Sequence, residues 1–401
     1  MNKARVSIVK TKQNPKYAEI HEAVKRALDL IGGVKDIIKP GDLVLINPSW
    51  VAPPVEREAG CITIPEIPRA LADMTRELGA RPVIAESSAV GVDTEKVIET
   101  SGYRDLREMG YEVVNLKKTP HVDIPTENGK IFDTVECWEL VQQADVIISV
   151  PKLKTHDQTE MTCAIKKLKG LLTDEGKKGM HQQGLFDGVI DHLTAVKPKL
   201  AVVDAIICQE GIGPVFGRPV EMNLILAGKD LVAVDSTCSR LIGYEPDEIL
   251  LTVNAAARGL GVMDPGKIEI IGEPLDAVKR SFLRAVQDDP VCVEDFHLVH
   301  GEVACTGCRN TVMSALIDMR NAGQLEFLSG IWVLTGGALP PEGAPLENIV
   351  TVGKCMPKES RTQRHVTGCP PNNAYVVKAI IGDRAEVKRM YADDALDKTE
   401  S

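Results

Sequence analysis

The sequence has no uninterrupted run of about 18 apolar residues, so it predicts no membrane-spanning helix. Its first ten residues lack the apolar stretch and small-residue cleavage site of a secretory signal. A basic surplus is missing as well: 47 Lys and Arg stand against 57 Asp and Glu, a net charge of −10. This sign argues against a protein whose main partner is nucleic acid, so any anion site must be a local patch. We expect a cytoplasmic protein that binds neither nucleic acid nor membrane.

Internal repeats and low-complexity tracts are also absent from the 401 residues, of which 44% are hydrophobic and 26% charged. This composition is typical of a globular protein, and the length predicts two or three domains. Pro, Asp and basic residues interrupt the pattern of strands and helices near 272–289, which predicts a domain boundary there. We therefore expect a core domain over 1–285, a smaller α/β domain over 290–385 and a charged tail over 386–401.

Short apolar runs alternate with helix-length amphipathic segments through the first two-thirds of the chain. The expected strands are 6–9, 43–46, 82–85, 113–116, 146–150 and 200–203, and the expected helices include 21–31, 67–78 and 94–101. Such alternation implies right-handed crossovers and a mainly parallel sheet with helices on both faces. The predicted fold class is α/β, a doubly wound core with a smaller C-terminal α/β domain.

Polar turns follow four of these strands, at the edge where ligands of parallel sheets bind. They begin at 47, 86, 151 and 204, and the last leads into the glycine-rich segment 210–217. Taken singly such turns are ordinary, but four on one rim indicate a site. The glycines precede a strand-like run and do not begin a helix, whereas a dinucleotide-binding glycine motif lies at the start of a helix. They predict a tight loop at the mouth of the cleft instead.

A basic stretch lies between residues 151 and 181, where seven lysines oppose four acidic residues. Lys166 and Lys169 share one helical face, which continues through Thr162, and a helix N-terminus near 159–162 would add amide donors. The sequence therefore predicts a cleft for a carboxylate or phosphate, the alternative being a solvated basic face. We assign catalytic roles to His156, Lys166 and His181, and substrate binding to Asn47, Lys152, Lys154, Thr162, Lys169 and Glu210.

Each residue type suits its assigned role. Histidine titrates near neutral pH and can move protons, and lysine can hold an anion and stabilise developing negative charge. Asp204, Glu210 and Asp235 are candidates for orienting these groups or for a divalent metal, with helix capping or a structural ion pair as the alternative.

Four of the ten cysteines lie on turns in the C-terminal quarter: Cys305, Cys308, Cys355 and Cys369. Thiols stay reduced in the cytoplasm, and soft thiolates select zinc or iron–sulfur clusters. A structural zinc site is the alternative to a cluster. The other six are expected to be small buried hydrophobes: Cys61, Cys137, Cys163, Cys208, Cys238 and Cys292.

The motifs Cys305-Thr-Gly-Cys308, Val-Gly-Lys-Cys355 and His365-Val-Thr-Gly-Cys369-Pro-Pro-Asn resemble the proximal [4Fe-4S] site in the small subunit of nickel-iron hydrogenases. The resemblance implies that these four cysteines hold one [4Fe-4S] cluster, with zinc as the alternative. It departs at Ala304, where the hydrogenase pattern usually has an acidic residue.

Residues 40–270 resemble the prokaryotic family called domain of unknown function 362. The likeness is carried by Val150-Pro-Lys-Leu-Lys-Thr-His156, Ile165-Lys-Lys-Leu-Lys-Gly170, Glu210-Gly-Ile-Gly-Pro and Asp230-x-x-Ala-Val-Asp235. Asn47-Pro48-Ser49 replaces the usual Lys-Pro-Asn, and Lys167 stands where Asn is common. The layout of Asn47, Thr63, Pro65 and Glu86 is also faintly similar to the N-terminal part of nickel-dependent lactate racemase-like proteins.

Together these features predict an iron–sulfur oxidoreductase or electron-transfer protein with a small anionic substrate. Ferredoxin or another low-potential donor is the expected electron partner, and a homo-oligomer is compatible with the sequence. Two other functions stay open. One is the assembly or maturation of a metal centre, and the other is a redox-neutral isomerase or racemase-like enzyme in which the metal is structural.

Overall fold

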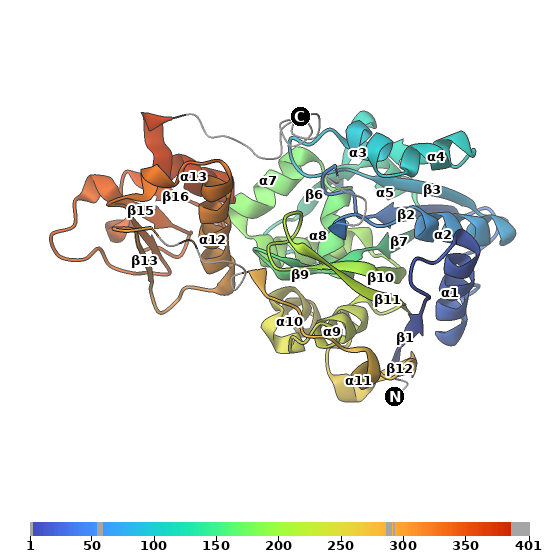
Figure 1. Cartoon of the computed structure of the whole chain (residues 1–401). Helices are drawn as coiled ribbons and strands as arrows, with labels where there is room; N and C mark the ends of the chain where they lie inside the picture. The colour runs from blue at the N-terminus through green and yellow to red at the C-terminus, as the bar shows by residue number, and fades with distance from the viewer. Residues whose placement is uncertain (1–2, 54–58, 286–290, 292, 386–401) are drawn as a thin grey trace, which may run out of the picture.

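The computed structural model describes residues 3–53, 59–285, 291 and 293–385, arranged around two large sheets and one two-stranded sheet (Figure 1). The predicted tail at 386–401 lies outside these residues, as does Cys292. Residues 286–290 are also outside them, so the division into domains at 285–290 stays a prediction. Among the described residues, no helix is long and apolar enough to cross a membrane.

The large sheet has ten strands in the order β12-β1-β11-β10-β7-β2-β3-β4, with β8 paired to β10 and β9 to β8. The strands are β1 (Ala4–Lys10), β2 (Leu43–Pro48), β3 (Arg81–Glu86), β4 (Val113–Asn115), β7 (Val146–Val150), β8 (Lys152–His156), β9 (Glu160–Thr162), β10 (Leu200–Glu210), β11 (Arg218–Gly228) and β12 (Ile268–Gly272). Six of its nine strand pairs are parallel, which confirms the predicted mainly parallel core.

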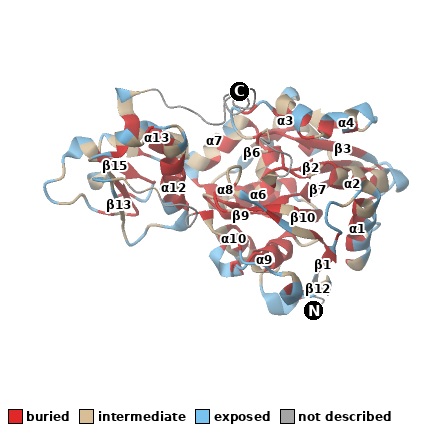
Figure 2. Ribbon diagram, in the orientation of Figure 1, coloured by how far each residue is buried: buried red, intermediate tan, exposed pale blue. Residues whose placement is uncertain are grey.

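Helices cover both faces because successive strand residues point to opposite sides. In β2, Val44 and Ile46 enter one apolar core while Leu45 enters the other. The helices of this part are α1 (Tyr17–Leu30), α2 (Glu66–Glu77), α3 (Thr94–Thr100), α4 (Tyr103–Glu108), α5 (Glu139–Gln143), α6 (Ala164–Lys167), α7 (Asp174–Gln183), α8 (Leu185–Val196), α9 (Leu231–Leu241), α10 (Leu250–Ala257) and α11 (Leu275–Val278). Figure 2 shows the buried residues concentrated in the sheet and on the inner sides of these helices.

One predicted element is wrong. Residues 159–162 do not begin a helix, because Glu160–Thr162 forms β9 and pairs antiparallel with β8. Helix α6 begins at Ala164 instead. A second hairpin, β5 (His121–Pro125) with β6 (Thr134–Trp138), has no counterpart in the prediction.

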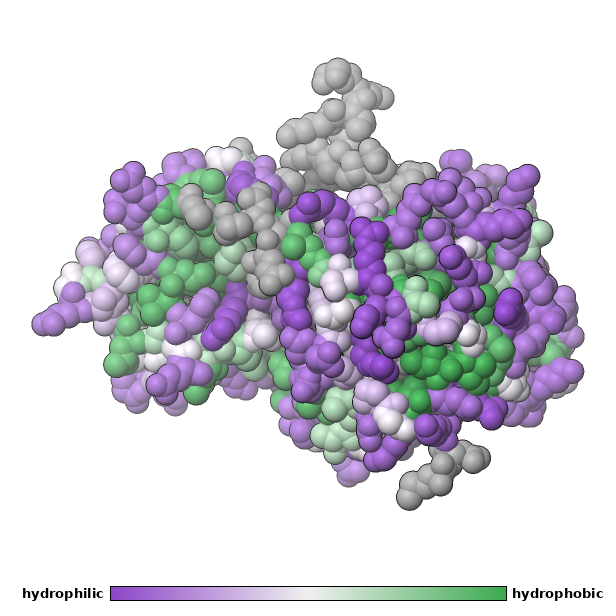
Figure 3. Space-filling view, turned by 60° about the horizontal axis from the view of Figure 1, so that its bottom comes forward, coloured by the Kyte–Doolittle hydropathy of each residue, from purple (hydrophilic) through white to green (hydrophobic). Residues whose placement is uncertain are grey.

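The second sheet is fully parallel, in the order β13 (His297–His300), β14 (Trp332–Thr335), β15 (Ile349–Val352) and β16 (Arg364–Val366). Helices α12 (Thr306–Asn321) and α13 (Asn373–Ile381) pack on it and bury a separate apolar core. On the face shown in Figure 3, apolar side chains gather in patches between polar ones.

The turn between β8 and β9 joins the two parts of the molecule. Gln158 Nε2 donates to Thr311 Oγ1 at 2.7 Å and to the Pro371 carbonyl at 3.0 Å. Asn310 Nδ2 donates to Glu160 Oε1 at 3.0 Å. These buried contacts fix the first turns of α12 and the loop before α13 against the rim of the large sheet.

The glycine-rich loop approaches β8 closely, as expected. Thr155 Oγ1 donates to the Gly211 carbonyl at 2.7 Å, and Asp157 N donates to the Gly213 carbonyl at 3.0 Å. A Cβ at Gly213 would lie 1.9 Å from the Thr155 carbonyl oxygen, so this position requires glycine.

We expect Gly213→Ala to destabilise the fold by about 1–3 kcal/mol, because the methyl group forces the loop away from β8. Urea unfolding measures the change. Gly179→Ala is the matched control: its added Cβ would meet nothing closer than 3.9 Å, and alanine suits the interior of α7 better than glycine. Equal stability of the two variants would show that the close approach is unimportant.

Candidate functional site

A cavity of about 640 Å³ lies at the carboxyl ends of β2, β3 and β8, and the start of α13 closes one side of it. This is the rim on which the sequence placed the polar turns. Its basic side chains come from the segment 151–181: Lys154, His156, Lys166, Lys167, Lys169, Lys177, Lys178 and His181. Its acidic side chains are Glu86, Asp157, Asp174 and Asp318.

Lys167 is buried in an ion pair with Glu86. Its amine also donates to Asn47 Oδ1 at 2.5 Å, and Asn47 Nδ2 donates to Glu86 Oε2 at 2.7 Å. Burial raises the pKa of Glu86, and Lys167 opposes that rise. A Cβ at Gly170 would lie 1.7 Å from Glu86 Oε1, which explains the glycine after the lysine motif. The three polar side chains thus satisfy one another at the cavity wall, with Asn47 behind the lining residues Glu86 and Lys167.

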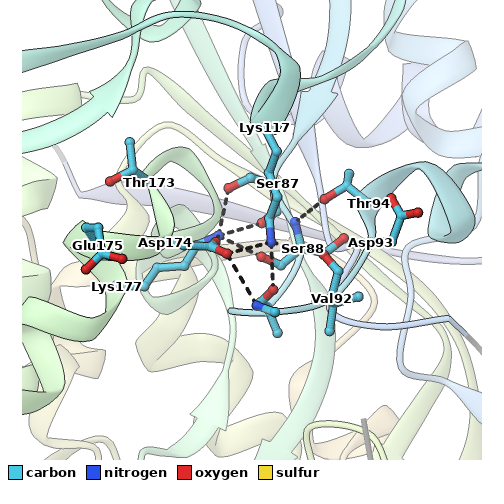
Figure 4. Close-up of polar contacts among 12 residues, drawn as sticks. Ser87, Ser88, Val92, Asp93, Thr94, Lys117, Thr173, Asp174, Glu175 and Lys177 are labelled. Atoms are coloured by element: carbon cyan, nitrogen blue, oxygen red, sulfur yellow. Dashed lines mark hydrogen bonds and ion pairs between the residues drawn. The ribbon is translucent and has the colours of Figure 1, made fainter. Parts of the chain in front are cut away.

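Lys177 and Lys117 hold the loop that follows β3 (Figure 4). Lys177 Nζ donates to Ser87 Oγ and to the Ser88 carbonyl, both at 2.7 Å. Lys117 Nζ donates to the carbonyls of Ala89 and Val92 at 2.9 and 3.0 Å and to Asp174 at 2.9 Å. These two lysines have structural partners within the wall.

Lys152 and Lys154 point from β8 to different partners. Lys152 forms a fully buried ion pair with Asp204 at 2.6 Å and does not line the cavity. Lys154 Nζ donates to the carbonyls of Cys61 at 2.7 Å and Pro214 at 2.9 Å. Burial lowers the pKa of Lys154 to about 7, with Lys166 adding to the effect.

Lys166 and Lys169 stand side by side on the cavity wall, from α6 and the following 3₁₀ turn Leu168–Leu171. Lys169 Nζ lies 3.0 Å from His181 Nε2. Burial lowers the pKa of each lysine to about 7, with a contribution from Lys169 at Lys166 and from Lys177 at Lys169. Burial also lowers the pKa of His181 well below its usual range, and Lys169 and Lys166 add to this. An anion bound among these groups would relieve their mutual repulsion.

His156 is paired with the residue that follows it. Its Nδ1 lies 2.8 Å from Asp157 Oδ1. The backbone amide of Gln158 donates to the same nitrogen at 3.0 Å, so two contacts at Nδ1 fix the orientation of the ring. Burial, reinforced by Lys166, lowers the pKa of His156 to about 4, so the ring is neutral at pH 7.

The carboxylates Asp204, Glu210 and Asp235 each serve a structural partner. Asp235 caps α6 by accepting from the backbone amides of Ala164 at 2.7 Å and Ile165 at 3.3 Å. The helix N-terminus that the sequence offered to an anion is therefore occupied by a side chain. Glu210 accepts from the Leu283 amide at 3.0 Å, away from the cavity wall.

The cavity brings together six of the nine predicted cleft residues: Lys154, His156, Thr162, Lys166, Lys169 and His181. Asn47, Lys152 and Glu210 are not among its lining residues. The sequence analysis missed Asp157, Lys177 and Asp318. The position of Asp157 beside His156 was a usable signal, whereas Asp318 comes from α12, and nothing local places it here. The functional roles of all these residues stay predictions.

The four C-terminal cysteines lie on turns that follow β13, β15 and β16. Cys305 is the N-cap of α12 and Cys308 is in its first turn. A Cβ at Gly353 would lie 2.9 Å from Cys308 Sγ and 3.5 Å from Cys355 Sγ, so both thiols face this glycine. The Cys308 thiol, helped by the amides of Cys308 and Gly307, lowers the pKa of Cys305 to about 5. Cys305, Cys355 and Cys369 together raise the pKa of Cys308.

Chemically, this donor set suits a thiolate-ligated centre. Four thiols gather at one sheet edge, and backbone amides stabilise one of them as thiolate. Within the described part of the chain, however, no group of three or more His, Cys, Asp and Glu side chains is arranged to hold a metal ion. The iron–sulfur and zinc assignments therefore both stay predictions.

The cysteine turns and the cavity share a boundary. Cys369 N donates to the His181 carbonyl at 3.0 Å, and Leu185 N donates to the Cys369 carbonyl at 2.6 Å. Residues 372–375, which follow Cys369 directly, line the cavity. One loop therefore carries both a predicted cysteine ligand and part of the cavity wall.

Two known proteins are similar to this chain, one in sequence and one in an alignment of structures. The chain is 28% identical over 254 residues to the thylakoid-associated protein sll1697 of Synechocystis, an alignment covering 61% of this chain and 76% of that protein. The lactate racemase apoprotein from Thermoanaerobacterium thermosaccharolyticum aligns with 96% of this chain and 91% of its own, at 11% identity and a TM-score of 0.41.

A comparison with protein families covers the segment that carries the lysine and histidine cleft. Residues 44–240 match the model of the domain of unknown function DUF362, and this span contains every predicted cleft residue. The match confirms the resemblance noted from the sequence motifs. Residues 44–240 of this chain are thus similar to the DUF362 family.

Proposed function

We propose that this protein is an iron–sulfur oxidoreductase or electron-transfer protein that acts on a small anion, a carboxylate or a phosphate. The anion binds in the cavity, and Cys305, Cys308, Cys355 and Cys369 hold one [4Fe-4S] cluster beside it. The observation that carries the proposal is the hydrogen bond from Cys369 N to the carbonyl of His181, whose ring lies in the cavity.

The cavity's own residues supply binding and proton transfer. Lys166 and Lys169 attract the anion, and the buried hydroxyl of Thr162, which has no hydrogen-bond partner among the described residues, is a further donor. The His156 ring exchanges a proton with the substrate, while Asp157 and the Gln158 amide keep the ring oriented through Nδ1. The lysine ammonium groups stabilise negative charge that develops on the substrate. A bound cluster would supply one-electron transfer.

The exposed side of the cysteine turns suits an electron partner. Cys305, Cys355 and Cys369 are exposed, so a centre held by them would lie near the surface. We propose ferredoxin or another low-potential protein as the donor and the cytoplasm as the location. A homo-oligomer is compatible with this arrangement.

The second candidate function is a redox-neutral isomerase, with a structural metal in the cysteine turns. The pair of His156 with Asp157 favours it, because an oriented neutral imidazole beside cationic lysines suits proton abstraction next to a carboxylate. The two candidates differ in what the cysteines hold.

Metal analysis separates them. After anaerobic purification we expect about four iron atoms and matching sulfide per chain, with an EPR signal on dithionite reduction. Cys369→Ser should lose most of the iron and the signal, because a hydroxyl is a poor iron ligand. Cys61→Ala removes a buried cysteine outside the four turns and should retain both. One zinc per chain and no iron would overturn the redox proposal and favour the isomerase.

Anion binding should weaken as the pH rises. Lys154, Lys166 and Lys169 lose protons near pH 7 in the free protein because burial lowers each pKa to about 7. A bound anion keeps them protonated, so binding takes up protons. Affinity is therefore greatest below pH 7 and falls about tenfold per pH unit above it for each lysine that must be protonated.

Titration calorimetry with sulfate, whose charge is constant over this range, measures the effect. Lys166→Ala should weaken sulfate binding about tenfold or more. Lys267→Ala, which removes an exposed lysine far from the cavity lining, should leave binding unchanged. A sulfate affinity that does not depend on pH would contradict the assignment of the lysines as the anion site.

A further inference from the structure

Six lysines line the cavity, and five of them have partners for their amines. Lys154 donates to two carbonyls, and Lys169 lies 3.0 Å from His181 Nε2. Lys167 is paired with Glu86, Lys177 is held by Ser87 and Ser88, and Lys178 lies 2.6 Å from Glu175. Among the described residues Lys166 alone of the six forms no hydrogen bond or ion pair, although its side chain reaches the cavity.

We propose that Lys166 is a nucleophile that forms an imine with the carbonyl group of a small anionic substrate, such as a 2-oxo acid. The proposal rests on the anion cleft of the proposed function and does not depend on the cluster. It adds a carbonyl group to the substrate class and gives Lys166 a covalent role.

The surroundings of Lys166 suit this chemistry. A lysine attacks carbonyl groups only as the free amine, and a dry site beside another cation favours that form. Burial, assisted by Lys169, lowers the pKa of Lys166 to about 7. An exposed lysine with a pKa of about 10.4 is almost wholly protonated at pH 7. Lys166 therefore differs from the surface lysines in the property that matters for attack.

Neighbouring groups complete the site. Lys169 and Lys154 supply positive charge for the carboxylate, and Thr162 has a buried hydroxyl without a partner among the described side chains. The His156 ring also lines the cavity and can exchange protons with the substrate. Lys166 Nζ bonds to the carbonyl carbon, and the carbonyl oxygen leaves as water, carrying away two hydrogens from the amine. The step is redox-neutral and needs no further reactant.

Borohydride trapping tests this assignment. Pyruvate and sodium borohydride are added to the wild-type protein at pH 7; hydride adds to an imine carbon and fixes the adduct as a secondary amine. Peptide mapping by mass spectrometry should find the adduct on Lys166 in more than about tenfold excess over any surface lysine. Acetone, which lacks the carboxylate, should label Lys166 far less than pyruvate does.

Two variants sharpen the test. Lys166→Arg keeps the positive charge but has no nucleophilic amine, so labelling in the cavity should vanish while sulfate still binds. Lys267→Arg alters an exposed lysine outside the cavity and should label like wild type.

Labelling spread evenly over surface lysines, or undiminished in Lys166→Arg, would overturn the proposal. The mapping on wild-type protein stands even where a variant fails to fold. If no imine is trapped on Lys166 but sulfate still binds, the imine proposal is wrong and the anion cleft remains supported. If the wild-type protein does not bind sulfate, the assignment of the anion cleft is itself wrong.

Discussion

Burying an ammonium group costs several kcal/mol unless hydrogen-bonding or charged partners replace the water around it. This protein buries several lysine ammonium groups around one cavity and gives most of them such partners. The cost explains much of the local architecture. Lys167 lies against Glu86 and Asn47, Lys152 against Asp204, and Lys177 among the oxygens of the loop after β3. These partners come from β2, β3 and β10, so satisfying the lysines also fixes the strand ends relative to one another. Lys166 stands out because no such partner lies beside its amine in the described part of the chain.

The hairpin of β8 and β9 lines the cleft and also connects the large sheet to the C-terminal part of the chain. Its strands carry Lys154, His156 and Thr162 into the cavity, and its turn reaches α12 and the loop before α13 through Gln158 and Glu160. His156, which lines the cavity, is thus two positions from Gln158, which contacts the C-terminal part. A displacement of that part would be transmitted to His156 through a short, hydrogen-bonded turn.

Much of the large sheet was predictable, since buried parallel strands are short, continuous apolar runs, as in 146–150. The rim was predictable too, because carboxyl ends of parallel strands share one edge. The segment 159–162 was misjudged because it becomes strand β9 by pairing with β8, which in turn pairs with β10. No local sequence pattern reveals these pairings. Asn47 and Lys152 were correctly placed near the strand ends, but their partners turn them inward. The contribution of Asp318 and Tyr375 depends on how the second sheet docks, which a sequence pattern does not encode.

The loop from Cys369 to α13 makes the two predicted sites interdependent. Its cysteine amide is held by the His181 carbonyl, and residues 372–375 then line the same cavity as the lysines. Any centre that binds the Cys369 thiol restrains this loop from one end, and any anion that binds the lysines packs against it from the other. Two ligands that order the same segment favour one another, because the second meets a segment already ordered by the first. Ligand binding at the cysteine turns would thus affect anion binding in the cleft through the backbone, as well as through any electron transfer.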